Sequence, residues 1–202
     1  MDQTETEIQV LQGISEAPSL GYDGFPLGAL RENWNSVYDL SRNLAEVIRS
    51  DSSRRGEQFD AMVVIPRGSY YVANIVSREL GFLAPDILHM CMTSYDNGVT
   101  ERKEVFQYGQ MPSLEEVDGK DLLIIEEVCD SGETIAHASQ LLKLAGAGLI
   151  RSGALHYKPQ RSTTGYKPDW YGITTDAWIV YPWEVNEANG INANYTVKRC
   201  DD

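Results

Sequence analysis

The sequence is poor in the residues and segments on which several classes of protein depend. Cysteine occurs three times, at Cys91, Cys129 and Cys200, and this odd, widely spaced set suits neither a disulfide framework nor a CxxC zinc site. Such a pattern favours a reducing compartment, and we expect a cytoplasmic protein. The three histidines lie far apart without HExxH-like spacing, which argues against a transition-metal site.

Positive charge is also scarce. The 17 lysines and arginines stand against 30 aspartates and glutamates, which leaves a formal net charge of -13. Nucleic acids and anionic membrane surfaces are bound through basic faces, so the sequence predicts neither kind of partner. Long apolar runs are missing as well: the longest, 61–65 and 122–125, fall far short of the roughly 20 residues that cross a bilayer.

The sequence does contain an alternation of strand and helix patterns. A helix is predicted to begin near Asn35 or Ser36, which are good N-cap residues, and to end at the polar stretch 51–56. The other predicted elements are strands at 59–65, 87–92, 121–127, 149–157 and 177–180, helices at 70–80 and 134–145, and a long polar loop at 95–119.

This alternation implies right-handed crossovers and therefore an α/β fold, with a mainly parallel central sheet flanked by helices. The length of 202 residues suits one domain. We place its core at residues 34–185, an N-terminal tail or hood at 1–33 and a C-terminal tail at 186–202. Ligands of such sheets bind beyond the carboxyl ends of the strands, which directs attention to the loops that follow them.

The loop after the strand 121–127 has the most distinctive chemistry. Glu126 and Glu127 end the strand, and Asp130-Ser131-Gly132-Glu133-Thr134 opens a helix. A helix N-terminus with hydroxyls and a close-approaching glycine binds phosphate. Adjacent carboxylates suit a ligand that also brings hydroxyls or Mg²⁺, so the segment predicts a site for a phosphorylated sugar with Mg²⁺. The alternative is a simple helix cap beside two solvated glutamates.

This segment resembles the phosphoribosyl-pyrophosphate (PRPP) motif of the type I phosphoribosyltransferases. The motif is an apolar pair, two acidic residues, an apolar residue, any residue, and then Asp-Thr-Gly-x-Thr. The sequence departs from it at Glu127, where aspartate is commoner, and at Ser131, which replaces a threonine but keeps the hydroxyl. The longer Glu127 side chain could change how tightly the ribose hydroxyls are held.

The resemblance implies a role for each residue of the motif and for a second loop. The residues expected to bind PRPP are Glu126, Glu127, Asp130, Ser131, Gly132, Glu133, Thr134, Arg67 and Gly68. The last two lie in Ile65-Pro66-Arg67-Gly68-Ser69, which resembles the family's pyrophosphate loop. There an Arg-Gly or similar pair, often with a cis peptide bond, presents backbone amides to pyrophosphate. Taken alone, this segment would be an ordinary turn between a strand and a helix.

Ser94-Tyr95-Asp96 resembles the start of the family's flexible catalytic loop. The residues that follow, to about 111, are polar, and long structureless loops in compact domains are usually functional or disordered. The residues assigned to this lid are Ser94, Tyr95, Arg102 and Lys103. The last two are expected to approach the phosphates when the lid closes.

Two later segments resemble the purine-specific branch of the family. Lys158 resembles the lysine that donates to the exocyclic oxygen of a 6-oxopurine. Trp178 resembles the aromatic residue that stacks on the base, and Ile179 the residue whose backbone contacts the base edge. The segment from Trp178 to Glu184 is close to that of bacterial xanthine-guanine phosphoribosyltransferases. Taken alone, the tryptophans would be packing residues at a domain edge.

The resemblance covers about residues 35–185 and implies a reaction. A purine nitrogen displaces pyrophosphate from C1′ of PRPP, giving a nucleoside monophosphate and pyrophosphate in purine salvage. Asp130 is the expected catalytic residue, hydrogen-bonded to the imidazole edge of the base. Mg²⁺ is the expected cofactor, with Glu126, Glu127 and Glu184 as candidate metal residues. Family members usually form dimers or tetramers, so we expect a homo-oligomer.

Two other functions remain open from the sequence. One is a transferase of the same fold acting on orotate or uracil, against which Lys158 and Trp178 argue. The other is a PRPP-binding regulator without catalysis. Regulators of this kind usually carry a DNA-binding domain, for which this acidic chain has no room. The preference among hypoxanthine, guanine and xanthine is also open.

Overall fold

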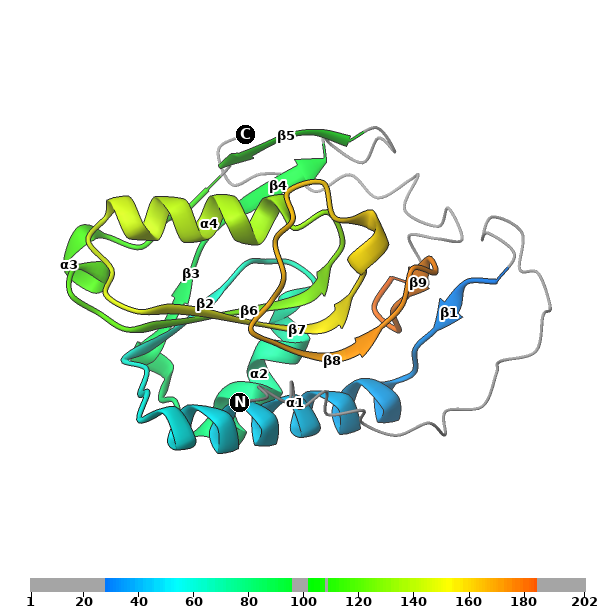
Figure 1. The fold of residues 1–202 in the computed structure, drawn as a ribbon, viewed down its shortest axis with the longest axis horizontal. Helices are drawn as coiled ribbons and strands as arrows, with labels where there is room; N and C mark the ends of the chain where they lie inside the picture. Colours follow the sequence, from blue (N-terminus) through cyan, green and yellow to red (C-terminus); the bar gives the residue numbers. More distant parts are fainter. Residues whose placement is uncertain (1–27, 96–101, 108, 185–202) are drawn as a thin grey trace, which may run out of the picture.

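The computed structural model describes residues 28–95, 102–107 and 109–184, and it describes residues 93–95 and 102–107 by their backbone alone. Its centre is a parallel sheet in the order β3-β2-β6-β7-β8 (Figure 1). The strands of this sheet are β2 (Ala61–Val64), β3 (Ile87–His89), β6 (Leu122–Cys129), β7 (Ile150–Tyr157) and β8 (Trp170–Thr174). The predicted α/β fold is confirmed.

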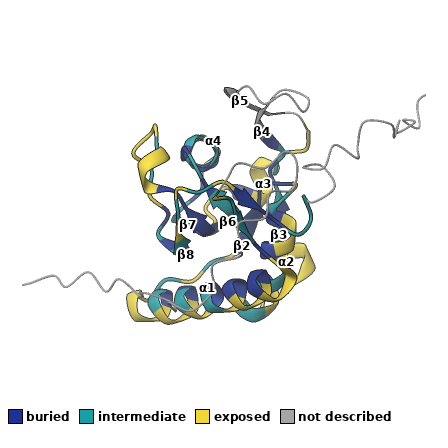
Figure 2. Cartoon of the chain, turned by 90° about the vertical axis from the view of Figure 1, so that its right-hand side faces the viewer, coloured by how far each residue is buried: buried dark blue, intermediate teal, exposed yellow. Residues whose placement is uncertain are grey.

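Helices cover both faces of the sheet, with α1 and α2 on one face and α4 on the other (Figure 1). The helices are α1 (Trp34–Arg55), α2 (Ser69–Leu80), α3 (Leu114–Val117) and α4 (Glu133–Leu144), with 3₁₀ turns η1 (Ala84–Asp86) and η2 (Pro159–Arg161). Figure 2 shows the buried residues of α1 facing the sheet and its exposed residues facing outward.

The strand β6 contributes to the core on both faces of the sheet. Its side chains alternate: Leu123 and Ile125 pack with residues of α1 and α2, whereas Leu122 and Ile124 pack with residues of α4. All four are fully buried. The continuous apolar run therefore forms a strand covered on both faces, as predicted.

The helix α1 starts earlier than predicted. Its N-cap is Asn33, not Asn35 or Ser36. The Asn33 side chain accepts hydrogen bonds from the amides of Asn35 (2.9 Å) and Ser36 (3.0 Å), and the Ser36 hydroxyl accepts in return from the Asn33 amide (2.9 Å). This reciprocal pair satisfies amides that an open helix end would leave unpaired.

The same helix also continues through the stretch 51–56 that was predicted to be a loop. Ser52 is buried and its hydroxyl donates to a carbonyl one turn earlier (2.6 Å), while Asp51 forms an ion pair with Arg55 (2.6 Å). These contacts compensate for the weak helix propensity of the polar run. The helix ends at Gly56, which has a left-handed φ of 68°.

The predicted fifth strand, 177–180, is wrong as part of the central sheet. It contains only the short β9 (Ile179–Val180), which pairs in parallel with β1 (Leu30–Arg31) in a separate two-stranded sheet. The fifth strand is instead β8, which the sequence analysis missed. β8 includes Gly172, where a Cβ would lie 2.7 Å from the Leu155 carbonyl. A glycine weakens the pattern by which a strand is predicted from sequence. The reason for this glycine is the close approach of β7, which only the structure shows.

The stretch 95–119, predicted as a loop, contains regular structure. β5 (Arg102–Gln107) pairs antiparallel with β4 (Met92–Tyr95), and α3 follows. The predicted strand 87–92 is accordingly divided, because the chain leaves the central sheet after β3. The polar composition of β5 carries no apolar periodicity by which a strand is recognised.

In the two-stranded sheet, β1 belongs to the segment 1–33 predicted as a tail or hood, whereas β9 belongs to the predicted core; we call this sheet the hood. Most of both predicted tails, residues 1–27 and 186–202, lies outside the described residues, so the domain boundaries stay a prediction. Within the described ranges, no helix is both long and apolar enough to cross a membrane.

Candidate functional site

Three neighbouring strands bring predicted site residues to one edge of the sheet. Val64 of β2 is in register with Ile125 of β6, so the loop after β2 lies beside the acidic residues that end β6. Cys129 is in register with Tyr157, and the Lys158 amide donates to the Cys129 carbonyl (2.9 Å). The loops after β2, β6 and β7 therefore meet, as the carboxyl ends of parallel strands do.

Glu126 and Glu127, which we call the acidic pair, carry unpaired polar atoms. Oε2 of each is buried and has no hydrogen-bond partner among the described residues. Burial, with the charge of its neighbour, raises the pKa of Glu126 well above its usual value. Burial, to which the charge of Glu184 adds, raises the pKa of Glu127 to about 7. Such oxygens suit a ligand that brings hydroxyl donors or a cation.

The acidic pair fits Mg²⁺ together with a ligand, and the role of Glu184 toward the metal stays a prediction. Glu184 Oε2 accepts from the Tyr181 amide (3.3 Å) within a turn. Among the described residues, no three acidic, histidine or cysteine side chains are arranged to hold a metal ion. Mg²⁺ usually takes one or two carboxylates and completes its shell with substrate oxygens and water. The unpaired oxygens of the acidic pair match that requirement.

Asp130 lies between two cationic side chains. Its Oδ2 is 3.5 Å from Lys158 Nζ, and its Oδ1 is 2.7 Å from Arg161 Nε. Lys158 is buried, and burial lowers its pKa although Asp130 partly offsets this. The predicted catalytic carboxylate and the predicted base-binding lysine therefore meet. Arg161 was not predicted, because an arginine in a polar turn carries no distinctive sequence signal.

A loop after η2 packs against the predicted phosphate cradle at the start of α4. The Ser131 carbonyl accepts from the Thr163 amide (3.1 Å) and the Thr164 hydroxyl (3.2 Å). The Glu133 carboxylate accepts from the Thr163 hydroxyl (2.8 Å), so this side chain holds the loop. The Ser131 hydroxyl accepts from the Glu133 amide (3.3 Å), and Thr134 follows in the first turn of α4.

Two glycines of the site allow close backbone approach. Gly132 is the N-cap of α4 with a φ of 81°, and a Cβ there would lie 2.7 Å from Thr164 Oγ1 and 2.8 Å from Tyr166 Cβ. A Cβ on Gly68 would collide with the Glu127 carboxylate. Gly132 therefore excludes other residues, whereas a side chain at Gly68 would require the Glu127 carboxylate to move.

The pyrophosphate-type loop contains a cis peptide bond, one residue earlier than the resemblance indicated. The cis bond joins Pro66 to Arg67, whereas Arg67–Gly68 was the expected pair. The Arg67 side chain is exposed, and its carbonyl accepts from the Tyr70 amide (3.2 Å) as α2 begins.

The predicted base-binding residues of the hood differ in exposure. Ile179 is buried in the core, whereas Trp178 is 53% exposed while its carbonyl accepts from the Leu30 amide (2.7 Å). An exposed indole at this place is available to a ligand.

The predicted lid residues belong to the β4–β5 hairpin. Ser94 and Tyr95 end β4, Arg102 and Lys103 begin β5, and Tyr95 is paired with Arg102. Residues 96–101 and the side chains of all four lie outside what the structure describes. Their roles in closure stay a prediction.

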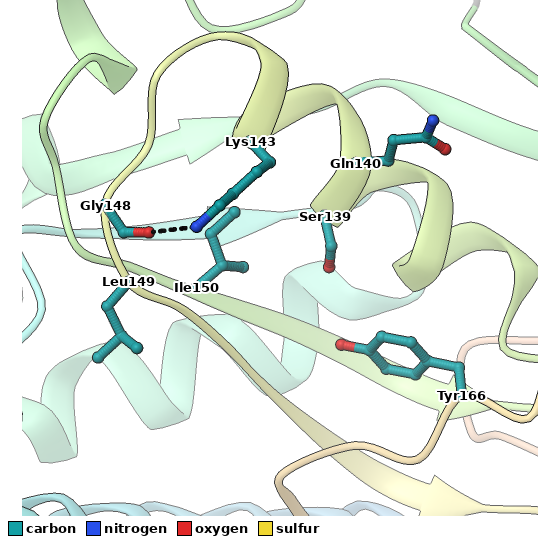
Figure 3. Close-up of a pocket in the computed structure, with 7 residues that line it drawn as sticks. All are labelled: Ser139, Gln140, Lys143, Gly148, Leu149, Ile150 and Tyr166. Carbon is teal, nitrogen blue, oxygen red and sulfur yellow. Dashed lines mark hydrogen bonds between the residues drawn. The ribbon is translucent and has the colours of Figure 1, made fainter.

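A cavity of about 440 Å³ lies away from these residues (Figure 3). It is lined by Ser139, Gln140, Lys143, Gly148, Leu149, Ile150 and Tyr166. Lys143 Nζ donates to the Gly148 carbonyl (3.3 Å) at its edge. The cavity faces the last turns of α4 and the start of β7, so it is at the opposite end of these elements from Asp130 and Lys158.

Comparison with known proteins establishes the family. The model of the phosphoribosyl transferase domain matches residues 29–188. The chain belongs to this family. This phosphoribosyltransferase is 25% identical over 156 residues to the xanthine-guanine phosphoribosyltransferase of Idiomarina loihiensis, covering 76% of this chain and 86% of the relative. It is 27% identical over 155 residues to that of Vibrio parahaemolyticus, covering 76% and 87%.

The fold of this phosphoribosyltransferase is also similar to solved structures. The purine phosphoribosyltransferase of Pyrococcus horikoshii matches it with a TM-score of 0.63 at 22% identity. The match covers 86% of this chain and 99% of the other. The sheet and its covering helices are thus those of the family.

Proposed function

We propose that this phosphoribosyltransferase transfers the phosphoribosyl group of PRPP to a 6-oxopurine base, hypoxanthine, guanine or xanthine, in purine salvage. The observation that carries the proposal is the acidic pair, whose buried, unpaired oxygens lie near the end of β6, just before the loop that leads to the α4 N-terminus. Ribose hydroxyls would donate to these oxygens, and the helix N-terminus would receive the 5-phosphate. The names of the Idiomarina and Vibrio relatives support a purine substrate.

In the proposed reaction, an imidazole nitrogen of the purine bonds to C1′ as the bond between C1′ and the pyrophosphate oxygen breaks. Positive charge then develops on the ribose, and the acidic pair places negative charge near it. Backbone amides around Arg67 and Gly68 face the leaving pyrophosphate. Asp130 hydrogen-bonds to the imidazole edge and exchanges a proton with it, assistance that is typically worth about 10²–10⁴-fold.

The base is selected by a hydrogen-bond donor of the protein and by stacking on an aromatic side chain. Lys158 donates to the exocyclic oxygen, and a site built to donate there rejects the amino group of adenine. Trp178 stacks on the ring, a contact worth about 1–3 kcal/mol per base, and the Ile179 backbone meets the base edge. Arg161 balances the charge of Asp130 beside Lys158.

Mg²⁺, held by the acidic pair together with PRPP oxygens, would neutralise charge on the pyrophosphate. Glu184 lies near enough to Glu127 to perturb its pKa and is proposed to reach the ion through water. Closure of the lid, with Ser94, Tyr95, Arg102 and Lys103, would exclude water that otherwise hydrolyses PRPP. We also propose that the protein is cytoplasmic and works as a homodimer or homotetramer, by analogy with its family.

A pyrophosphate-release assay with PRPP, Mg²⁺ and a panel of bases tests the proposal. We expect release with at least one of hypoxanthine, guanine and xanthine and none with orotate, uracil or adenine. Release with orotate or uracil alone would mean a different base class. PRPP binding without release on any base would mean a regulator.

A further inference from the structure

A buried chain of hydrogen bonds links the hood to the acidic pair. His156 of β7 is fully buried, with Nδ1 2.9 Å from the Tyr181 hydroxyl and Nε2 3.0 Å from Glu32 Oε1. The Tyr181 hydroxyl donates to the Glu127 carbonyl (2.9 Å). The chain therefore joins Glu32, which precedes the α1 cap, and the end of β7 to the segment after β9. The proposed reaction gives no role to Glu32, His156 or Tyr181.

The direction of the hydrogen bonds around Tyr181 follows from the groups involved. The Glu127 carbonyl can only accept, so Tyr181 gives it the single hydroxyl proton and must itself accept from Nδ1 of His156. At the other end, the Ser36 hydroxyl donates to Glu32 Oε2. Burial alone would raise the pKa of Glu32, but its hydrogen bonds with His156 and Ser36 lower it overall. Every side chain in this series has a partner on each side.

The Glu127 carbonyl lies at an irregular place in the sheet. β2 pairs with β6 only as far as Ile125, and the register pairs with β7 include Glu126 and Val128 but not Glu127. Tyr181 supplies the donor that a neighbouring strand would otherwise provide. A buried carbonyl without a donor costs free energy, and it would leave the end of β6 without a fixed orientation.

The Tyr181 ring is held independently of its hydroxyl. It stacks on Trp183 with centroids 4.6 Å apart and an angle of 6°, and Trp183 stacks on Tyr71 at 4.5 Å and 13°. Tyr71 lies in the first turn of α2, directly after the Arg67–Gly68 loop. Removing the hydroxyl alone would therefore keep the packing on both sides of the site.

We infer that Glu32, His156 and Tyr181 are positioning residues that fix the Glu127 carbonyl and thereby orient the acidic pair toward PRPP. The inference rests on the proposed function. The three side chains act through the backbone of Glu127 and do not touch the substrates. Their effect belongs to PRPP binding, because the hydrogen bond that they hold is to the backbone of Glu127, a residue assigned to PRPP and not to the base.

Steady-state kinetics of Tyr181→Phe test this inference, with Tyr157→Phe as the matched control. Tyr157 is a buried tyrosine of β7, and its hydroxyl makes no hydrogen bond to any residue that the structure describes. We expect Tyr181→Phe to raise KM for PRPP about three- to tenfold, the range for one hydrogen bond. KM for the base and the melting temperature should stay near those of the control.

A double mutant separates positioning from general loosening of the structure. Glu32→Gln keeps the shape of the side chain and should raise KM for PRPP less than Tyr181→Phe does. Adding Glu32→Gln to Tyr181→Phe should have no further effect, because Glu32 acts through that hydroxyl. If Glu32→Gln fails to fold, Tyr181→Phe alone decides.

Two results would overturn the inference: an unchanged KM for PRPP in Tyr181→Phe, or additive effects in the double mutant. If KM for PRPP and KM for the base rose equally in Tyr181→Phe, these residues would have a merely structural role. A wild-type protein that releases no pyrophosphate on any base would instead contradict the proposed function.

Discussion

Asp130 shows how one carboxylate serves both electrostatics and chemistry. It faces a buried lysine at one carboxylate oxygen and an exposed arginine at the other. Exchanging it for an amide of the same shape changes the charge and the proton-accepting ability at once. Its neighbour Cys129, whose thiol pKa burial raises to about 12, stays uncharged and takes no part.

We predict that Asp130→Asn slows purine nucleotide formation at least about tenfold, because general acid–base help at the imidazole edge is lost. PRPP binding should change little, since the acidic pair and the amides are intact. Turnover and the PRPP dissociation constant from calorimetry measure the two effects. Asp176→Asn is the control, because Asp176 also lies near Lys158 but accepts from the Gln160 amide (3.2 Å). Unchanged turnover of Asp130→Asn on all three oxopurines would contradict the assignment.

In the protein without ligand, Glu127 makes the free energy of unfolding depend on pH. Its folded-state pKa, about 7, lies above the ordinary value of 4.5, so the native state binds more protons between these values. Stability is therefore lost as pH rises through this window. The free energy of unfolding of Glu127→Gln, relative to that of the wild type, should therefore rise by up to about 3 kcal/mol as the pH increases from 4.5 to 8. Denaturant unfolding at both pH values measures the gain; a constant difference would mean that Glu127 is not shifted.

At the scale of elements, the join between β6 and α4 depends on Gly132. This glycine combines a left-handed φ of 81° with close contact to the loop after η2. Gly165 in that same loop has a φ of 71° but open space where a Cβ would lie. A substitution at Gly165 therefore tests backbone strain alone, whereas a substitution at Gly132 tests backbone strain together with steric contact.

We predict that Gly132→Ala and Gly165→Ala both lose about 1–2 kcal/mol of stability from the left-handed backbone. Only Gly132→Ala should also weaken PRPP binding, since its methyl group displaces Thr164 and with it the cradle. Thermal unfolding and PRPP titration measure the two effects. Equal PRPP affinities of the two variants would show that the contact does not shape the cradle.

At the scale of the whole molecule, the net charge of -13 opposes an anionic substrate. An acidic protein cannot steer a multiply charged phosphate by its overall field, so binding depends on local amides and a divalent cation. Part of the charge excess belongs to the site, in Glu126, Glu127 and Asp130. Other acidic residues have structural roles: Glu32 accepts hydrogen bonds in the core, Asp51 pairs with Arg55, and Glu133 holds the loop after η2.

We therefore predict strict dependence on a divalent metal. Removing metal with a chelator should reduce pyrophosphate release to background, and Mg²⁺ should restore it fully. Melting temperature in the same buffers serves as the control, because the fold has no metal cluster within the described residues and should not change. Full activity in chelator would contradict the role assigned to the acidic pair.

The sequence by itself determined the α/β class, the order of the main elements and the acidic loop at the end of β6. Apolar runs, N-caps and glycines are local signals, so they can be recognised without knowledge of contacts. It did not determine that β8 rather than β9 completes the sheet, because edge-strand pairing depends on which neighbour is available. The polar helix end near Arg55 and the strand β5 were missed because their polar residues carry no apolar periodicity.

Only the tertiary structure decided which distant side chains share the site. Arg161 reaches Asp130 and Tyr181 reaches the Glu127 carbonyl through contacts that no spacing along the chain encodes. The buried histidine, which the sequence showed only as an isolated residue, lies between the hood and the acidic pair. Local propensity sets the elements, whereas burial and the need to pair every polar group set what surrounds the site.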